Sequence, residues 1–182
     1  MPKRRLKIIA IALALTVLVA VGTSFALLTS VAGPVENVFT IGDIRISLQE
    51  TTGGSYELIP GTVIAKDPTV KVEAGSEDCW LFVKIDKTKN FEDYLSYRLD
   101  SGWTHLGGYD GVYYRTVIKS GGGDEFPILA DNAITVREDL TKEKMADITE
   151  LPKLTFKAYA VQSRGIETAN DAWHRILEEV EG

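Results

Sequence analysis

The chain has 182 residues, of which 45% are hydrophobic and 25% are charged, and it carries a formal net charge of -6 and one cysteine. An acidic surface repels phosphate backbones, which argues against nucleic acid as a partner. A single cysteine cannot form an internal disulfide. We expect Cys79, which begins the apolar run CWLFVKI, to be a small buried hydrophobic residue.

The first 26 residues have the pattern of a signal peptide. Basic residues at positions 3, 4, 5 and 7 precede an apolar run at residues 8–21. Ser24 and Ala26 then place small residues at both positions that a signal peptidase reads, so we expect cleavage between Ala26 and Leu27. A second small-x-small site ends at Ala32. The competing interpretation is an uncleaved anchor, because a slightly longer apolar segment spans a bilayer.

Cleavage after Ala26 divides the chain into three parts. Residues 1–26 form the signal peptide, residues 27–37 an N-terminal arm, and residues 38–182 a single folded domain. The signal peptide holds four of the 20 basic side chains and none of the 26 acidic ones, so 16 basic side chains remain and the net charge becomes -10. Apolar residues recur in the arm and at the start of the domain, and we treat them as candidates for contact with another chain. They are Leu28, Val31, Val35, Val38 and Phe39.

Alternating apolar and polar side chains predict strands through the first half of the domain. The alternation begins at Val38 and changes phase after Gly42, which indicates a bulge or a sharp twist. Further strands are predicted at residues 62–66 and within residues 68–75. Residues 79–86 are the most hydrophobic stretch after the signal and are expected to form a central core strand. A helical turn capped by Asn90 is expected next.

The second half of the domain also favours short strands. Residues 96–123 contain Ser-Gly, Gly-Gly and Asp-Gly turns that are typical of hairpins. Strands are expected at residues 128–136 and 154–162, separated by a surface helix within residues 137–148, and a helix closes the chain from residue 168 or 170. This pattern predicts an antiparallel β-sandwich. The expected core residues are Trp80, Phe82, Val83 or Ile85, Phe156 and Ala158, with Trp173 docking the last helix.

No motif in the sequence carries a recognisable chemistry. His105 and His174 are too far apart for a helical zinc pair, and neither H-E-x-x-H nor G-x-S-x-G occurs. GGGDE at residues 121–125 lacks the Lys-Ser or Lys-Thr of a phosphate loop. The acidic pairs at residues 77–78 and 124–125 lack the spacing of a calcium loop. We therefore predict no catalytic, cofactor-binding or metal-binding residue.

The N-terminal region nevertheless resembles a known family. The signal ends in VGTSFALLTS, and NVFTIGDIRISLQE follows after a short linker. A small-residue cleavage site before an N-x-F-T-x-G-x-hydrophobic strand is similar to the TasA and camelysin group of secreted matrix proteins. The segments DPTVKVEAGSEDCWLFVKI and LTFKAYAVQSRGIETANDAW also resemble that group. The matching motif residues are Asn37, Phe39, Thr40, Gly42 and Ile44.

The resemblance implies export by a specialised signal peptidase and a jelly-roll sandwich that assembles into extracellular fibres. In such fibres each subunit donates its N-terminal segment as a strand to the next. Some relatives have been classed as metallopeptidases, but this sequence lacks the histidine ligands for that activity. What the resemblance implies is thus a structural protein that uses no cofactor.

We therefore predict a secreted subunit of an extracellular matrix or biofilm fibre, with no enzymatic activity. Its partners would be further copies of itself or a related matrix subunit, with a signal peptidase during export and a membrane only through the uncleaved signal. Cleavage would free residues 27–36 as an arm that adds to an open sheet edge. Pro34 has no N–H and must lie at the end of the donated strand. The alternatives are a secreted metallopeptidase-like hydrolase and a monomeric surface-binding module.

Overall fold

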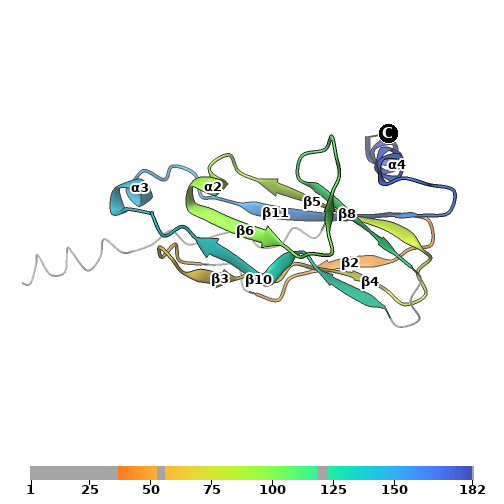
Figure 1. Ribbon diagram of the computed structural model, residues 1–182, viewed down its shortest axis with the longest axis horizontal. Coiled ribbons are helices and arrows are strands. Elements are labelled where there is room, and N and C mark those ends of the chain that lie inside the picture. The colour runs from red at the N-terminus through yellow and green to blue at the C-terminus, as the bar shows by residue number, and fades with distance from the viewer. Residues whose placement is uncertain (1–36, 53–55, 119–122, 182) are drawn as a thin grey trace, which may run out of the picture.

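The computed structural model describes residues 37–52, 56–118 and 123–181, and this part of the chain consists mainly of short strands (Figure 1). The strands form one five-stranded sheet and two three-stranded sheets. The predicted all-β class is confirmed.

The five-stranded sheet has the order β1-β11-β5-β8-β7. Neighbouring strands are antiparallel except β1 and β11, which are parallel. The predicted central position of residues 79–86 is confirmed, because this segment lies in β5 between β11 and β8. The strands are β1 (Asn37–Ile41), β11 (Leu154–Gln162), β5 (Cys79–Lys87), β8 (Val112–Val117) and β7 (Thr104–His105).

The two smaller sheets face the large one and continue one another. Their orders are β2-β4-β9 and β3-β10-β6. In the chain β3 leads into β4 and β9 leads into β10, so the two sheets form one interrupted layer opposite β5 and β11 (Figure 1). Their strands are β2 (Ile46–Gln49), β4 (Thr69–Val72), β9 (Asp124–Pro127), β3 (Val63–Ala65), β10 (Leu129–Val136) and β6 (Leu95–Leu99).

The main core lies between the two layers. Strict alternation along β5 and β11 turns one set of side chains inward, which is the period that a half-buried strand requires. The expected burial of Val83, Ile85, Phe156 and Ala158 is confirmed. Opposite them lie buried side chains of the second layer, among them Leu48, Val70, Val72, Ile134 and Val136.

The outward face of β5 is also apolar, which the prediction of one facing core did not include. Phe82 is fully buried and Trp80 is half-buried, but both belong to a second cluster on the outer face of the five-stranded sheet. The helix α4 (Ala169–Glu181) covers that face through Trp173. The expected burial of Phe82 is therefore confirmed, although it lies beneath α4 and not between the sheets, and Trp80 is only half-buried on the same outer face. The expected docking of Trp173 on one sheet is also confirmed.

The other helices are short. α2 (Phe91–Tyr94) follows Asn90, but the Asn90 side chain does not cap it and instead donates to the Glu150 carbonyl at 2.7 Å. α3 (Lys142–Ala146) is the predicted surface helix and has no buried residue. Thr168 caps α4, because its Oγ1 accepts a hydrogen bond from the Asp171 N–H at 3.1 Å.

Three local predictions from turn residues were incomplete. Gly42, with φ of 98°, does not bulge one strand but marks the crossing from β1 to β2 in the opposite layer. The Ser101-Gly102 turn does not close a hairpin, because β6 pairs with β10 and β7 pairs with β8. β9, which begins at Asp124 after the glycine run, was not predicted.

Candidate functional site

β1 is an edge strand and is the first element that the structure describes after the predicted arm. It pairs in parallel with β11, from Asn37 beside Lys157 to Ile41 beside Val161. Within the described residues no strand pairs with its other side. The chain that precedes β1 is thus continuous with an edge of the five-stranded sheet.

Of the predicted cleavage and assembly residues, only Val38 and Phe39 fall within the described part of the chain. Val38 is 38% exposed, whereas Phe39 packs against the cluster under α4. The two neighbours therefore face opposite sides of β1, as alternation along a strand requires. The remaining candidates, Ala26, Leu27, Leu28, Val31 and Val35, lie outside the described residues.

β3 forms a second edge, on the opposite layer. The Val136 N–H donates to the Thr62 carbonyl at 2.9 Å, and the Lys66 N–H donates to the Asn132 carbonyl at 2.8 Å. Because antiparallel pairs alternate between bonded and non-bonded positions, Val63 and Ala65 direct their N–H and C=O groups away from β10. No strand of the described chain pairs with this side of β3, so its backbone presents hydrogen-bonding groups at an edge that is open among the described residues.

The side chains of β3 make this edge apolar. Val63 is 67% exposed and Ala65 is also exposed, whereas Ile64 is buried in the core. Ile59, in the turn before β3, is 49% exposed. Exposed apolar edges are uncommon because they invite pairing with another chain. The pattern V-I-A, with no polar residue on its outer face, was the sequence signal for this edge, and the sequence reasoning missed it.

The other sheet edges are more protected. β7 has only two residues, and the exposed residues of β6 are Ser96 and Arg98. β2 lies against β1 and β11 of the opposite layer. Beside β9, the Trp103 indole N–H donates to the Pro127 carbonyl at 2.7 Å. Charged edges and covered edges both resist strand addition.

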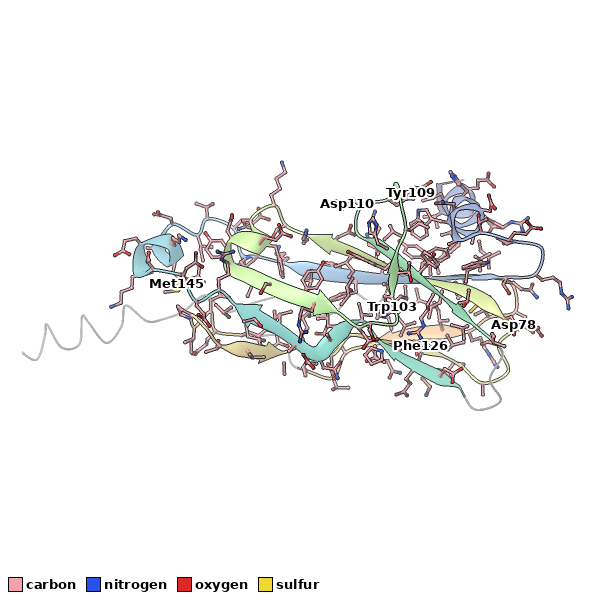
Figure 2. The ribbon with its side chains drawn as sticks, viewed as in Figure 1. Asp78, Trp103, Tyr109, Asp110, Phe126 and Met145 are labelled. Atoms are coloured by element: carbon pink, nitrogen blue, oxygen red, sulfur yellow. The ribbon has the colours of Figure 1, made fainter. Side chains whose placement is uncertain are left out.

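A stack around Arg115 ties the two layers together on the β9 side. Arg115 of β8 places its guanidinium 4.0 Å from the Phe126 ring centroid and 5.4 Å from that of Trp103. Figure 2 shows Trp103 and Phe126 near one another. Desolvation lowers the pKa of Arg115, although Asp100 and Asp124 act in the opposite direction. This side of the sandwich is therefore closed by side chains, unlike the β3 edge.

A buried ion pair lies just beyond the open edge of β3. Lys66 Nζ is 2.6 Å from Glu50 Oε1, and the two side chains are only 3% and 4% exposed. The Lys66 ammonium also lies 5.6 Å from the Phe156 ring centroid. Such a pair is stable only when both charges stay matched, because each has lost its water. It fixes the chain after β2 against the end of β3.

The next residue, Asp67, holds the same segment. Its carboxylate accepts hydrogen bonds from the backbone N–H groups of Thr51 and Thr52 at 2.9 and 3.0 Å, and from both hydroxyls. Partial burial acts to raise the pKa of Asp67, but the hydrogen bonds from Thr51 and Thr52 together outweigh it and lower the pKa to about 2. The end of β3 is thus anchored by polar side chains in addition to its pairing with β10.

The two histidines considered for catalysis lie in different elements. His105 lies in β7 beside Tyr113, and His174 lies on α4 with Nε2 at 3.1 Å from the Tyr109 hydroxyl. Cys79 is buried as expected, and burial, with a contribution from Asp78, raises its pKa to about 12. Among the residues with a described position, no group of three or more His, Cys, Asp or Glu side chains is arranged to hold a metal ion.

Over the same described ranges, no helix combines the length and apolar character needed to cross a membrane. Comparison of the chain with protein-family models, with curated proteins and with solved structures gives no match. The edges of β1 and β3 are therefore the features of this fold from which a function can be argued.

Proposed function

We propose that the protein is a secreted structural subunit of an extracellular matrix, and that it assembles into fibres by donating its N-terminal segment as a strand to another copy. In this proposal the two layers of sheet form a jelly roll, and the protein is not an enzyme. The observation that carries the proposal is the β3 edge, which is apolar, exposed and unpaired in the described chain.

The β3 edge has what strand addition requires. The N–H and C=O groups of Val63 and Ala65 point outward, and main-chain hydrogen bonds supply much of the affinity when a strand adds to a sheet. Its exposed apolar surface, Val63 and Ile59, would contact apolar side chains of the incoming strand. A neighbouring copy would thereby bury surface that a monomer leaves in water.

The predicted arm, residues 27–36, suits this edge in composition and length. It is LLTSVAGPVE, with Glu36 as its single charged side chain. At about 3.3 Å per residue, ten extended residues reach roughly 33 Å, which is longer than a three-residue strand needs. Pro34 would lie at the end of the added strand, near β1 of the donor, where a missing N–H has least effect.

Electrostatics favours a strand-based assembly over contact between whole surfaces. After the predicted cleavage each copy has a net charge of -10, so copies repel one another at low ionic strength. The arm and the β3 edge are the nearly uncharged exceptions. Added salt, which screens the repulsion, should therefore increase the rate of assembly.

The test compares two exposed valines in the chain that begins at Leu27. Val63→Lys places a charge on the β3 edge, and Val180→Lys places the same charge on α4, where valine is 49% exposed. We expect Val63→Lys to prevent fibres in electron microscopy and Val180→Lys to leave them unchanged. Ala65→Pro is a second edge variant, since it removes an outward N–H and keeps the pairing with β10.

Deletion of residues 27–36 tests the donor side of the same contact. The deleted protein should remain a folded monomer, and a free peptide of this sequence should slow assembly of the intact chain. Fibres that form normally from the deleted protein would contradict strand donation, and monomers under all salt and pH conditions would contradict the fibre itself. Peptide or ester hydrolysis that disappears in His105→Ala or His174→Ala would instead support the secreted hydrolase.

A further inference from the structure

α4 docks on the outer face of the five-stranded sheet through one aromatic side chain. The Trp173 ring centroid lies 5.1 Å from that of Phe82 and 5.2 Å from that of Tyr159. Figure 1 shows α4 at the end of the sheet away from α3, and Figure 2 shows Tyr109 beside it. The apolar residues between α4 and the sheet form a group that we call the outer cluster. Its buried members are Phe82, Leu106, Val112, Val161, Ala169, Ala172, Trp173 and Ile176.

The outer cluster also supports β1. Phe39 and Ile41 pack against it, and the register places them beside Tyr159 and Val161 of β11. None of the β1 side chains that the structure describes belongs to the main core. β1 is therefore held by its parallel pairing with β11, by its contact with β2 and by its contact with the cluster that α4 completes.

In its docked position α4 buries a polar group that lacks a hydrogen bond. The Trp173 side chain is buried, yet its Nε1 has no hydrogen-bond partner within the described part of the chain. An unsatisfied buried donor lowers the stability of the docked helix relative to the undocked one. The connecting residues 163–168 include Gly165, with φ of 77° and open space around it. These features suit a helix that can leave the sheet without unfolding the main core.

We propose that α4 is a latch that holds β1 against β11. Undocking of α4 removes the support of Phe39 and Ile41, so β1 detaches and the free N-terminal segment gains residues 37–41. The biological consequence rests on the proposed function, because a longer free segment forms a longer donated strand. The coupling between α4 and β1 is a property of the monomer and can be measured without fibres.

The experiment is hydrogen exchange on the chain that begins at Leu27, resolved for residues 38–41 of β1 and 81–85 of β5. In Trp173→Ala the β1 amides that bond to β11 should exchange roughly tenfold faster or more, whereas the β5 amides keep the wild-type rate. Phe39→Ala removes the contact from the other side and should release β1 in the same way. Trp173→Phe keeps a ring but removes the unpaired N–H, so it should leave β1 protected at least as well as the wild type.

Each outcome bears on the latch. Unchanged exchange of β1 in both Trp173→Ala and Phe39→Ala would overturn it, and so would equal acceleration of β1 and β5, because that result describes global unfolding. The same variants separate the latch from the fibre. If β1 is released and assembly becomes faster, both proposals are supported. If β1 is released but neither the wild type nor the variants form fibres, the latch stands and the proposed function fails.

Discussion

β11 has two neighbours that are held in different ways. On one side β5 pairs with it over nine positions in antiparallel register, from Leu154 beside Lys87 to Gln162 beside Cys79. On the other side β1 pairs over five positions in parallel register. β5 buries side chains on both faces, whereas the described side chains of β1 that pack into a cluster, Phe39 and Ile41, do so only on the outer face. The same strand therefore has one neighbour with a long pairing and one with a shorter pairing.

The second layer shows the same contrast. β4 and β10 lie inside their sheets, and Val70, Val72 and Val136 are at most 4% exposed. β3, at the open edge, has three residues, two of them exposed. Interior strands are thus paired on both sides and buried on the core side, whereas β1 and β3 each pair with one strand and are supported further by a helix and by polar contacts, respectively. Stability is not uniform across such a structure, and edges are the segments expected to open first.

The largest effect is expected from the interior side of this comparison. Leu81 of β5 is fully buried in the main core, so Leu81→Ala should lower the free energy of unfolding by about 4 kcal/mol. Ile118→Ala, at a position 78% exposed, is the matched control and should change it by less than about 0.5 kcal/mol. Urea denaturation measures both. Similar small effects for the two variants would show that β5 is no more essential than the surface.

The interior strands were predictable from sequence because burial leaves a pattern in the side chains. Residues 79–83 form a continuous apolar run, and residues 154–158 alternate between apolar and polar side chains. The two segments became β5 and β11, the most extensively paired strands of the fold. The sheet partners were not predictable from turn residues. Ser101-Gly102 has hairpin chemistry, yet it connects β6 and β7 in different layers.

An intermediate effect is expected at the end of β3. Lys66→Met leaves the buried carboxylate of Glu50 without its counter-ion, which should cost about 3 kcal/mol of unfolding free energy. The double variant Glu50→Leu with Lys66→Met should recover most of that loss, because an apolar pair of similar volume needs no desolvated charge. A double-mutant cycle by urea denaturation measures the coupling. Additive losses would mean that the ion pair does not hold this edge.

The candidate site was less predictable than the core. The sequence located the first domain strand at Val38 and Phe39, but it did not show that β1 would pair in parallel or lie under α4. The β3 edge depends on which strands fail to find a neighbour, and that is a property of the whole topology. Neither the Glu50–Lys66 pair nor the bonds of Asp67 leave a periodic signal, because their partners lie about fifteen residues apart in loops.

The smallest effect is expected from Asp67, which anchors the same edge by hydrogen bonds. The donors Thr51 and Thr52 together outweigh the effect of burial and lower its pKa to about 2, below the value of about 3.9 for an unfolded aspartate. A carboxyl with a lower pKa in the folded state adds stability that is fully present above about pH 4 and disappears as the pH falls through about 2. The difference in unfolding free energy between the wild type and Asp67→Asn should therefore shrink between pH 5 and pH 2 in urea titrations. Thr52→Val, which removes one hydroxyl donor, should show a smaller form of the same trend. If the wild type and Asp67→Asn differ by a constant amount over this range, Asp67 does not stabilise the β3 edge through its charge. Of these two charged contacts, only the buried Glu50–Lys66 pair would then stabilise the β3 edge, whereas β1 is supported by α4.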